Sequence, residues 1–241
     1  MVNGGVMPDA RTERWAEHRK KMRRTLVDAA IRAIDAQGPH VSMREIAAEA
    51  KIPKPTLYRF FTDKWELVNA INDRVMDTLT DRIVMGPQLT AGTLGEMVHD
   101  GIAGYADFVS RHPRVFRFLQ LNFSGANAGA ASPGVHAIET ARTMAFDISS
   151  VLSALVPGAS EERSDGIHEL DAAAAMIMGA VVFAADGWVG DDVPTESVES
   201  FVDRTAPYIR ALLAVAASKT GNAELDFDAS IAENLAAVYA S

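Results

Sequence analysis

The sequence contains no cysteine and few aromatic residues, with three tryptophans, four tyrosines and ten phenylalanines among 241 residues. Without cysteine, the chain has no disulfide, no thiolate nucleophile and no cysteine-ligated zinc site, which is typical of a reducing compartment. The first fifteen residues, MVNGGVMPDARTERW, lack the apolar segment of a secretory signal peptide. We therefore expect a cytoplasmic protein.

Long apolar runs are also missing, and no segment shows a convincing alternation of apolar and polar residues that would indicate a strand. The run Ala172–Ala185, AAAAMIMGAVVFAA, has fourteen residues without a charge, and Asp171 and Asp186 bound it. Because a bilayer requires about 20 apolar residues, this run predicts a buried helix in a protein that does not contact a membrane.

Positive charge is scarce outside the first quarter of the chain. Residues 1–64 contain 13 Lys and Arg against 8 Asp and Glu, whereas residues 65–241 contain 10 against 24. The whole chain carries a formal charge of -9, although its first quarter is positive. A basic end on an acidic protein indicates a module that binds a polyanion.

Within this basic end, residues 42–64, SMREIAAEAKIPKPTLYRFFTDK, predict two short helices joined by a tight turn. Ser42 and Glu45 have the spacing of a capping box, and apolar residues follow at helical spacing. Pro55 stands in the first turn of the second helix, where proline is favoured. Leu57 and Phe61, four residues apart, are expected to face inward.

The outward face of this second helix would carry Lys54, Thr56, Tyr58 and Arg59. Cationic side chains hold phosphates and hydroxyl groups reach phosphates or base edges, so this face suits the major groove of duplex DNA. A small three-helix unit can also pack without touching DNA, and a Lys and an Arg on a short helix are commonly a solvated face. The charge asymmetry favours the DNA interpretation.

The stretch resembles the DNA-binding domain of TetR-family transcriptional regulators. The resemblance covers about residues 24–70 and rests on Arg44-x-Ile46-Ala47, Pro55-Thr56-Leu57-Tyr58-x-x-Phe61 and Asp63-Lys64-x-x-Leu67. The family commonly has glycine where Lys51 stands and serine where Pro53 stands. A left-handed lysine would cost about 1 kcal/mol, which a stiffer turn at the proline would partly offset. The residues that we predict to contact DNA are Ser42, Arg44, Lys54, Pro55, Thr56, Tyr58, Arg59 and Lys64.

Another basic segment precedes this unit, because residues 11–24, RTERWAEHRKKMRR, hold seven Lys and Arg against two Glu. One interpretation is a solvated extension of the first helix, which we expect to run from about Arg19 to Gln37. The other is a basic arm that contacts phosphates or the minor groove beside the helix–turn–helix. The sequence leaves both open, and Trp15 hints that the arm packs against another part of the chain.

We expect an all-α fold of two domains, with an N-terminal three-helix helix–turn–helix DNA-binding domain and a C-terminal helical domain for ligand binding and dimerisation. Residues 1–18 would form a disordered or basic arm, 19–84 the DNA-binding domain with its linking helix, and 85–241 the second domain, after the break at Met85-Gly86-Pro87. Capping and breaking residues predict helices over Lys64–Val84, Leu94–Arg111, from Pro113 to Phe123, from Pro133 to about Leu155, from Ser160 to about Val189, from Thr195 to about Ser218, and from Ala229 to about Tyr239.

The resemblance implies that the second domain dimerises through the Ala172–Ala185 and Thr195–Ser218 helices and holds a pocket for an effector. The apolar bulk on its helices suggests an elongated hydrophobic ligand such as a fatty acid or related lipid, with Gln120 and Asn122 orienting a polar head group. The residues that we predict at this ligand site are Tyr105, Phe108, Phe116, Leu119, Gln120, Phe123, Met144, Ile148, Met176 and Phe183.

We expect neither a cofactor nor a metal ion, and we do not expect an enzyme. His168 and Asp171 lie three residues apart, but no third ligand is evident. No nucleophile or acid–base pair stands out.

The sequence thus predicts a bacterial, ligand-responsive transcriptional regulator, most simply a repressor. It would bind a palindromic operator as a homodimer, and a small hydrophobic effector would release it by acting through the Lys64–Val84 helix. The alternative is a helical lipid carrier whose basic end contacts a membrane or another polyanion.

Overall fold

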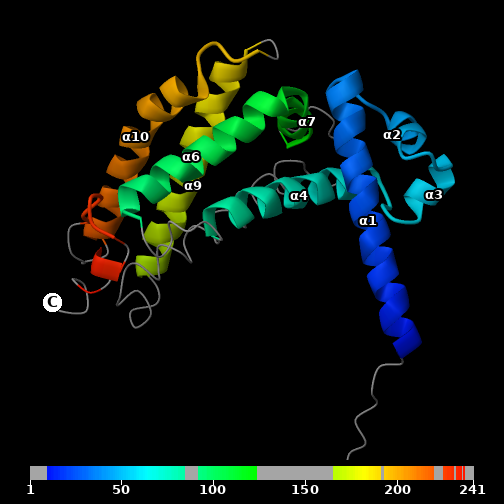
Figure 1. The fold of residues 1–241 in the computed structure, drawn as a ribbon, viewed down its shortest axis with the longest axis horizontal. Coiled ribbons are helices and arrows are strands. Elements are labelled where there is room, and N and C mark those ends of the chain that lie inside the picture. The colour runs from blue at the N-terminus through cyan, green and yellow to red at the C-terminus, as the bar shows by residue number, and fades with distance from the viewer. Residues whose placement is uncertain are drawn as a thin grey trace, which may run out of the picture. The chain divides into compact units, whose positions relative to one another are not determined.

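The computed structural model describes residues 10–84, 92–123, 165–190, 193–219, 225–230, 232–234 and 236. The chain divides into two compact units, Met1–Val75 and Met76–Ser241, and we describe each by itself. Within the described ranges every regular element is a helix, so the expected all-α fold is confirmed (Figure 1). The expected break at Met85-Gly86-Pro87 lies outside the described residues, and the division between the units falls inside a helix.

The first unit contains α1 (Ala10–Gln37), α2 (Met43–Glu49), α3 (Lys54–Tyr58) and the first half of α4 (Lys64–Val84). The expected start of the first helix at Arg19 was wrong, because α1 is continuous from Ala10. Helix formation is cooperative, so the turns that are anchored in the domain act as a nucleus from which the N-terminal turns propagate. Gly38 ends α1 as expected, with a φ of 100° that glycine adopts readily.

A single apolar core joins the four helices of the first unit. The deepest side chains come from all four helices and from the end of the α3 turn, and all are at most 2% exposed: Leu26, Ala30, Ala33, Ile34, Ile46, Ala47, Leu57, Phe61, Leu67, Val68 and Ile71. Fully burying one side chain of leucine or phenylalanine size contributes about 1.5–3 kcal/mol. This core therefore fixes the positions of α2 and α3, and the inward prediction for Leu57 and Phe61 is confirmed.

The turn between α2 and α3 has the left-handed residue that the sequence suggested. Lys51 has a φ of 55° and is the one residue other than glycine with a positive φ in the described ranges. Its amide donates to the carbonyl of Ala48, and the next amide, of Ile52, donates to the carbonyl of Ala47. These bonds close the end of α2 and hold the turn despite the unfavourable backbone conformation.

The second unit contains α6 (Leu94–Arg111), α7 (Pro113–Phe123), α9 (Asp165–Val189) and α10 (Val198–Lys219). Helices α6, α9 and α10 lie side by side around one core (Figure 1), which includes Ile102, Val181, Trp188, Phe201 and Ile209. The predicted ranges of α6 and α7 are confirmed. Thr93 begins α6 with a complete capping box that includes Glu96.

Helix α9 is buried on one face only, which corrects the prediction that the whole Ala172–Ala185 run is buried. Ile177, Val181 and Ala185 lie in the core, whereas Met176 and Phe183 are exposed. By length and composition alone, the window Ala172–Val189 is sufficient to cross a membrane. The same length and composition occur in core helices of soluble proteins, and α9 packs against α6 and α10 in this way.

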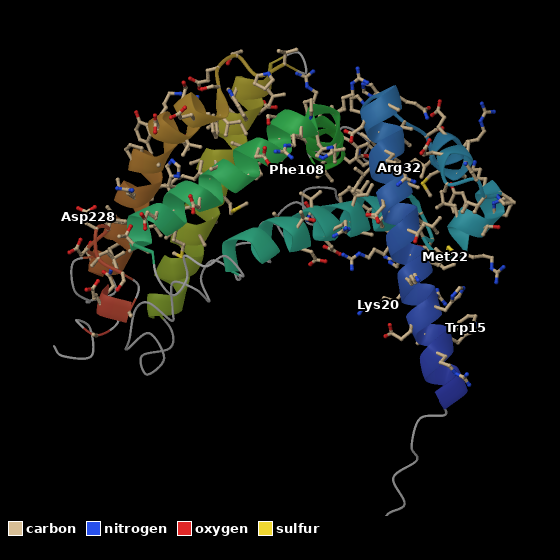
Figure 2. All side chains as sticks on the ribbon, viewed as in Figure 1. Trp15, Lys20, Met22, Arg32, Phe108 and Asp228 are labelled. Atoms are coloured by element: carbon tan, nitrogen blue, oxygen red, sulfur yellow. The ribbon has the colours of Figure 1, made fainter. Side chains whose placement is uncertain are left out.

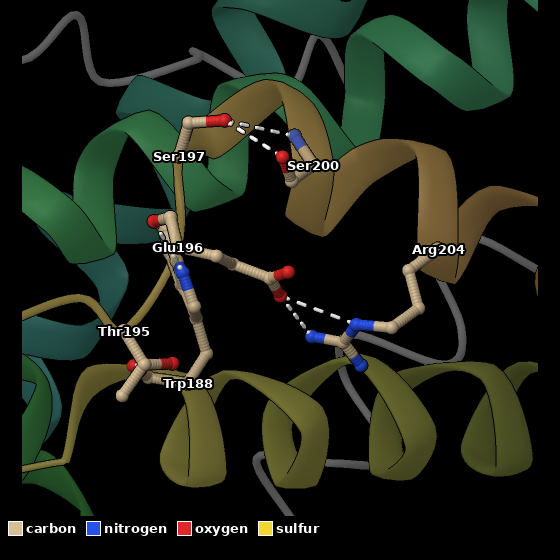
Figure 3. A network of polar contacts seen from close by, with 6 residues as sticks. All are labelled: Trp188, Thr195, Glu196, Ser197, Ser200 and Arg204. Carbon is tan, nitrogen blue, oxygen red and sulfur yellow. Dashed lines mark hydrogen bonds and ion pairs between the residues drawn. The ribbon is translucent and has the colours of Figure 1, made fainter.

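Figure 3 shows how α9 passes into α10 through a group of polar contacts. Thr195 was predicted to cap the second of these helices, but its amide and hydroxyl donate to the carbonyl of Trp188 at 2.9 and 3.1 Å. The cap is Ser197, whose hydroxyl oxygen accepts from the amide of Ser200 at 3.1 Å. The Trp188 indole donates to the carbonyl of Glu196 and stacks on Phe201 with ring centroids 4.5 Å apart.

The C-terminal segment packs on the start of α6. The amides of Leu94 and Gly95 donate to the carbonyls of Ala229 and Phe227 at 3.0 and 2.8 Å, which satisfies two amides of the first helical turn. Of the last predicted helix, residues 232–234 and 236 are helical. The predicted helix from Pro133 to Leu155 and the Ser160 cap lie outside the described residues.

Candidate functional site

The site begins at the N-terminus of α2, where Ser42 and Glu45 form the predicted capping box. The Ser42 hydroxyl donates to Glu45 Oε2 at 2.6 Å and the Ser42 amide donates to the same oxygen at 2.8 Å. These bonds lower the pKa of Glu45, with the side-chain bond as the larger cause. Ser42 and Arg44 are both exposed, so the predicted DNA contacts of α2 lie on its solvent face.

Helix α3 presents most of its polar side chains to solvent from a buried base. Pro53 precedes the helix with extended dihedral angles, and Pro55 lies in its first turn as predicted. Pro55 and Arg59 are exposed and Thr56 is half-buried, while Leu57 beneath them is inaccessible. A short rigid helix with a solvent-facing polar surface can enter a major groove.

Two side chains of this surface also contact each other. The Lys54 ammonium lies 5.7 Å from the ring centre of Tyr58, which is a cation–π distance. Because both groups are exposed, this contact contributes little stability, but it restricts the rotamers of two predicted DNA-contacting residues.

An ion pair that the sequence did not reveal fixes the end of the α3 turn. Arg23 Nη1 on α1 donates to the carbonyl of Phe60 and to Glu66 Oε1, both at 2.7 Å. Its guanidinium also lies 4.5 Å from the ring centre of Phe61. Since the partners are 37 and 43 residues apart in sequence, no local pattern could have indicated these contacts.

Glu66 completes this group, which we call the Arg23 clamp and define as Arg23, Phe60, Phe61, Thr62 and Glu66. Glu66 Oε2 accepts from the amide of Thr62 at 2.7 Å and from its hydroxyl at 3.0 Å. The amide bond from Thr62 is the largest cause of the lowered pKa of Glu66, and the bond from Arg23 adds to it. The clamp therefore connects α1 and α4 to the segment that follows α3.

Lys64 opens α4, directly after Asp63, whose carboxylate accepts from the amide of Glu66 at 2.7 Å and caps the helix as predicted. The Lys64 side chain is half-buried, and this burial lowers the pKa of its ammonium. The predicted DNA-contacting residues thus come from the start of α2, from α3 and from the start of α4, within one packed unit.

The predicted ligand residues fall into three groups. Tyr105 and Phe108 on α6 pack against the core of the second unit, and Phe116 on α7 belongs to that core. Leu119 is buried and Gln120 half-buried on α7, whereas Met176 and Phe183 are 53% and 81% exposed on the opposite face of α9. Met144 and Ile148, and the side chain of Phe123, lie outside the described residues.

Tyr105 is the ionisable group of this region with the clearest perturbation. Burial raises the pKa of its phenol, and the negative charge of nearby Asp186 raises the pKa further. The hydroxyl therefore stays protonated at neutral pH and can donate a hydrogen bond. Among the residues described, no group of three or more His, Asp or Glu side chains could hold a metal ion.

The comparisons with known proteins agree with this geometry. Residues 26–71 match the sequence model of the family described as bacterial regulatory proteins, tetR family. The chain is 29% identical over 200 residues to HTH-type transcriptional regulators from the CDC 1551 and H37Rv strains of Mycobacterium tuberculosis. The alignment covers 82% of this chain and 80% of each relative.

Solved structures share the fold at lower identity. A tetR-family transcriptional regulator from Streptomyces coelicolor has a TM-score of 0.59 and 22% identity, over 92% of this chain and 89% of that chain. The fatty acid degradation regulator FadR from Bacillus halodurans has a TM-score of 0.58 and 16% identity, over 78% and 93%. Because these matches cover 92% and 78% of this chain, the likeness in fold extends beyond the helix–turn–helix.

The match of residues 26–71 runs from the second half of α1 to the first part of α4 and includes the exposed α3 surface. Regulators of this family are not enzymes. Residues 26–71 thus match the DNA-binding domain of the TetR family of bacterial regulatory proteins, and most of the chain is similar to HTH-type transcriptional regulators.

Proposed function

We propose that this regulator is a repressor that binds a palindromic operator as a homodimer and leaves it when a small hydrophobic effector binds the second unit. The observation that carries the proposal is the surface of α3, where Lys54, Tyr58 and Arg59 project from a fully buried base. We propose Ser42, Arg44, Lys54, Pro55, Thr56, Tyr58, Arg59 and Lys64 as its DNA contacts. Such a surface matches the width of a major groove.

Dimerisation is supported by the exposed faces of α9 and α10. Met176 and Phe183 on α9 are 53% and 81% exposed, and Tyr208 and Val215 on α10 are 70% and 54% exposed. Small residues such as Gly179 and Ala180 lie between the two large side chains of α9 and allow close approach of another helix. Two copies joined by a twofold axis would cover these faces and read a palindrome.

The effector is proposed from the apolar side chains of α6 and α7 that approach the core. Phe108 and Phe116 supply apolar surface, and the protonated Tyr105 hydroxyl supplies a donor for a carbonyl or carboxylate. Fatty acids and their thioesters have this combination of a long apolar chain and an oxygen-bearing head. The name of the FadR regulator from Bacillus halodurans refers to fatty acid degradation, which supports the same ligand class.

Genome-wide mapping of bound sites, followed by anisotropy titrations on the recovered duplexes, tests the proposal. The expected result is a palindromic motif, binding at two chains per site, and release by saturated fatty acids or acyl thioesters but not by polar metabolites of similar size. A motif without internal symmetry would contradict the dimer. Release by no acyl compound would contradict the effector class, and transcription that falls when the protein is removed would contradict repression.

A further inference from the structure

Helix α1 continues well beyond the packed body of the first unit. Its first deeply buried side chain is Leu26, whereas every side chain from Arg14 to Lys21 is exposed. Figure 2 shows Trp15, Lys20 and Met22 on this projecting part, which we call the α1 extension and define as residues 10–22. Trp15 is 65% exposed, so the hint that it packs against another part of the chain is wrong.

The Arg23 clamp fixes where the extension leaves the domain. Arg23 bonds the carbonyl of Phe60, two residues after the end of α3, and contacts the Phe61 ring. The extension therefore starts beside the C-terminal end of α3. At 1.5 Å per residue, its 13 residues reach about 20 Å from that point.

The charge of the extension is unfavourable for an isolated helix. Its residues 10–22 hold five Lys and Arg against two Glu, at the helix end where the dipole favours negative charge. Lys20 and Arg24 also form a like-charge pair four residues apart. Glu17 lies three or four residues from Arg14, Lys20 and Lys21 and forms opposite-charge pairs with them, but one carboxylate offsets only part of the repulsion. Segments whose charges oppose the helix dipole and repel one another in this way often belong to functional sites.

We propose that the α1 extension binds the sugar–phosphate backbone of duplex DNA beside the segment read by α3, as a rigid helix rather than as a flexible arm. This inference rests on the proposed function. Within the extension, Arg19, Lys20 and Lys21 are the exposed cations closest to the clamp and supply the contacts. Arg23 does not, because its guanidinium already bonds Phe60 and Glu66. A reach of about 20 Å spans about six base pairs of flanking duplex.

The test compares full-length wild type with the variant Arg19→Gln, Lys20→Gln, Lys21→Gln. A charge-matched control carries Arg32→Gln, Arg111→Gln and Arg114→Gln, three wholly or partly exposed cations that lie outside the α1 extension, the α3 surface and the exposed faces of α9 and α10. The probe is a duplex selected by the wild-type protein from a random-sequence library. Two versions of this duplex are used. One is the core, the shortest segment that wild type binds, and the other carries eight further base pairs of mixed sequence on each side.

The expected result is that wild type binds the longer duplex about tenfold more tightly than the core, and that the variant loses this preference while the control keeps it. Each phosphate contact contributes about −0.9 to the slope of log K against log salt, so the variant should flatten the slope by up to about 2.7 per chain. Amide hydrogen exchange of residues 10–22 should slow on binding the longer duplex but not the core.

If wild type and variant show the same preference for the longer duplex and the same slope of log K against log salt, the inference is overturned. It is also overturned if the control loses this preference as much as the variant does, because net charge alone would then explain the effect. Failure of wild type to select any duplex would instead remove the proposed function. Loss of binding to vesicles of mixed neutral and anionic lipid, with duplex binding unchanged, would overturn the inference in favour of a membrane contact.

Discussion

Both units have an apolar core, but in the first unit charged side chains also connect helices that are far apart in sequence. Arg23 reaches Glu66 across 43 residues and Arg74 reaches Asp28 across 46. The described ion pair of Arg204 with Glu196 spans only eight residues. Directional polar contacts specify one geometry, while apolar contacts are non-directional. In the first unit, these directional contacts add to the apolar core and fix how its helices are placed.

The largest effect is expected when carboxylates are introduced on the exposed apolar face of α9 in the second unit. Ala180→Glu with Phe183→Glu should give monomers at micromolar concentration, because four carboxylates would meet across the proposed twofold axis. Operator affinity should fall about 100-fold or more, because the two half-sites would no longer act together. Light scattering and anisotropy measure both effects.

The control for this variant adds two carboxylates at exposed positions elsewhere, His99→Glu and Ala232→Glu. It should remain dimeric and bind DNA normally. A wild-type chain that is monomeric at micromolar concentration would remove the dimer from the proposal.

In the first unit, removing side chains from the α3 surface tests DNA binding and leaves the apolar core unchanged. Tyr58→Ala or Thr56→Ala should weaken specific operator binding by about 1–3 kcal/mol, as expected for base or close phosphate contacts. Arg32→Ala, which removes an exposed cation paired with Glu49, serves as the control and should have little effect. Unchanged affinity in both α3 variants would mean that this helix does not enter the groove.

The clamp can be broken separately from the α3 surface. Arg23→Met should lower the free energy of unfolding by about 1–2 kcal/mol, a value reduced for the partial exposure of both ion-pair partners. Arg24→Met, its exposed neighbour, should have no comparable effect. In urea denaturation, the double variant with Glu66→Gln should cost less than the sum of the single variants. Additive effects would show that the pair does not act as a unit.

A smaller effect is expected at the turn. Lys51→Gly should raise the free energy of unfolding by about 0.5–1 kcal/mol, because glycine relieves the left-handed strain but adds entropy to the unfolded chain. Lys51→Ala keeps the strain and should bring no gain. Equal midpoints for the glycine and alanine variants in urea would show that the turn is unstrained.

The smallest effect concerns pH. Because the pKa of Glu66 is lowered in the folded state, its stabilising contribution is present above the unfolded pKa of about 4.3 and is lost as pH falls through the folded pKa. The stability difference between wild type and Glu66→Gln, below about 1 kcal/mol for such an exposed pair, should therefore shrink between pH 5 and pH 3. A difference that grows on acidification would contradict this role.

Several features followed from the sequence because their causes are local. The Ser42–Glu45 capping box and the Asp63 cap each depend on neighbours within four residues, and the left-handed Lys51 was expected from the family resemblance. The helix–turn–helix was recognisable for the same reason, since its apolar spacing and turn residues are contiguous. The start of α1 was misplaced because helix propagation from a packed body overrides weak local signals.

Only the tertiary structure determined the contacts between residues that are far apart in sequence and the face of each helix that is buried. The Arg23 clamp joins residues that no local pattern connects, and it determined both the anchoring of α3 and the exit of the α1 extension. The composition of α9 showed that the helix is apolar, but only packing against α6 and α10 determined that Val181 is buried and Phe183 exposed. An evenly apolar helix has no polar face to mark its solvent side, so its orientation is set by its neighbours.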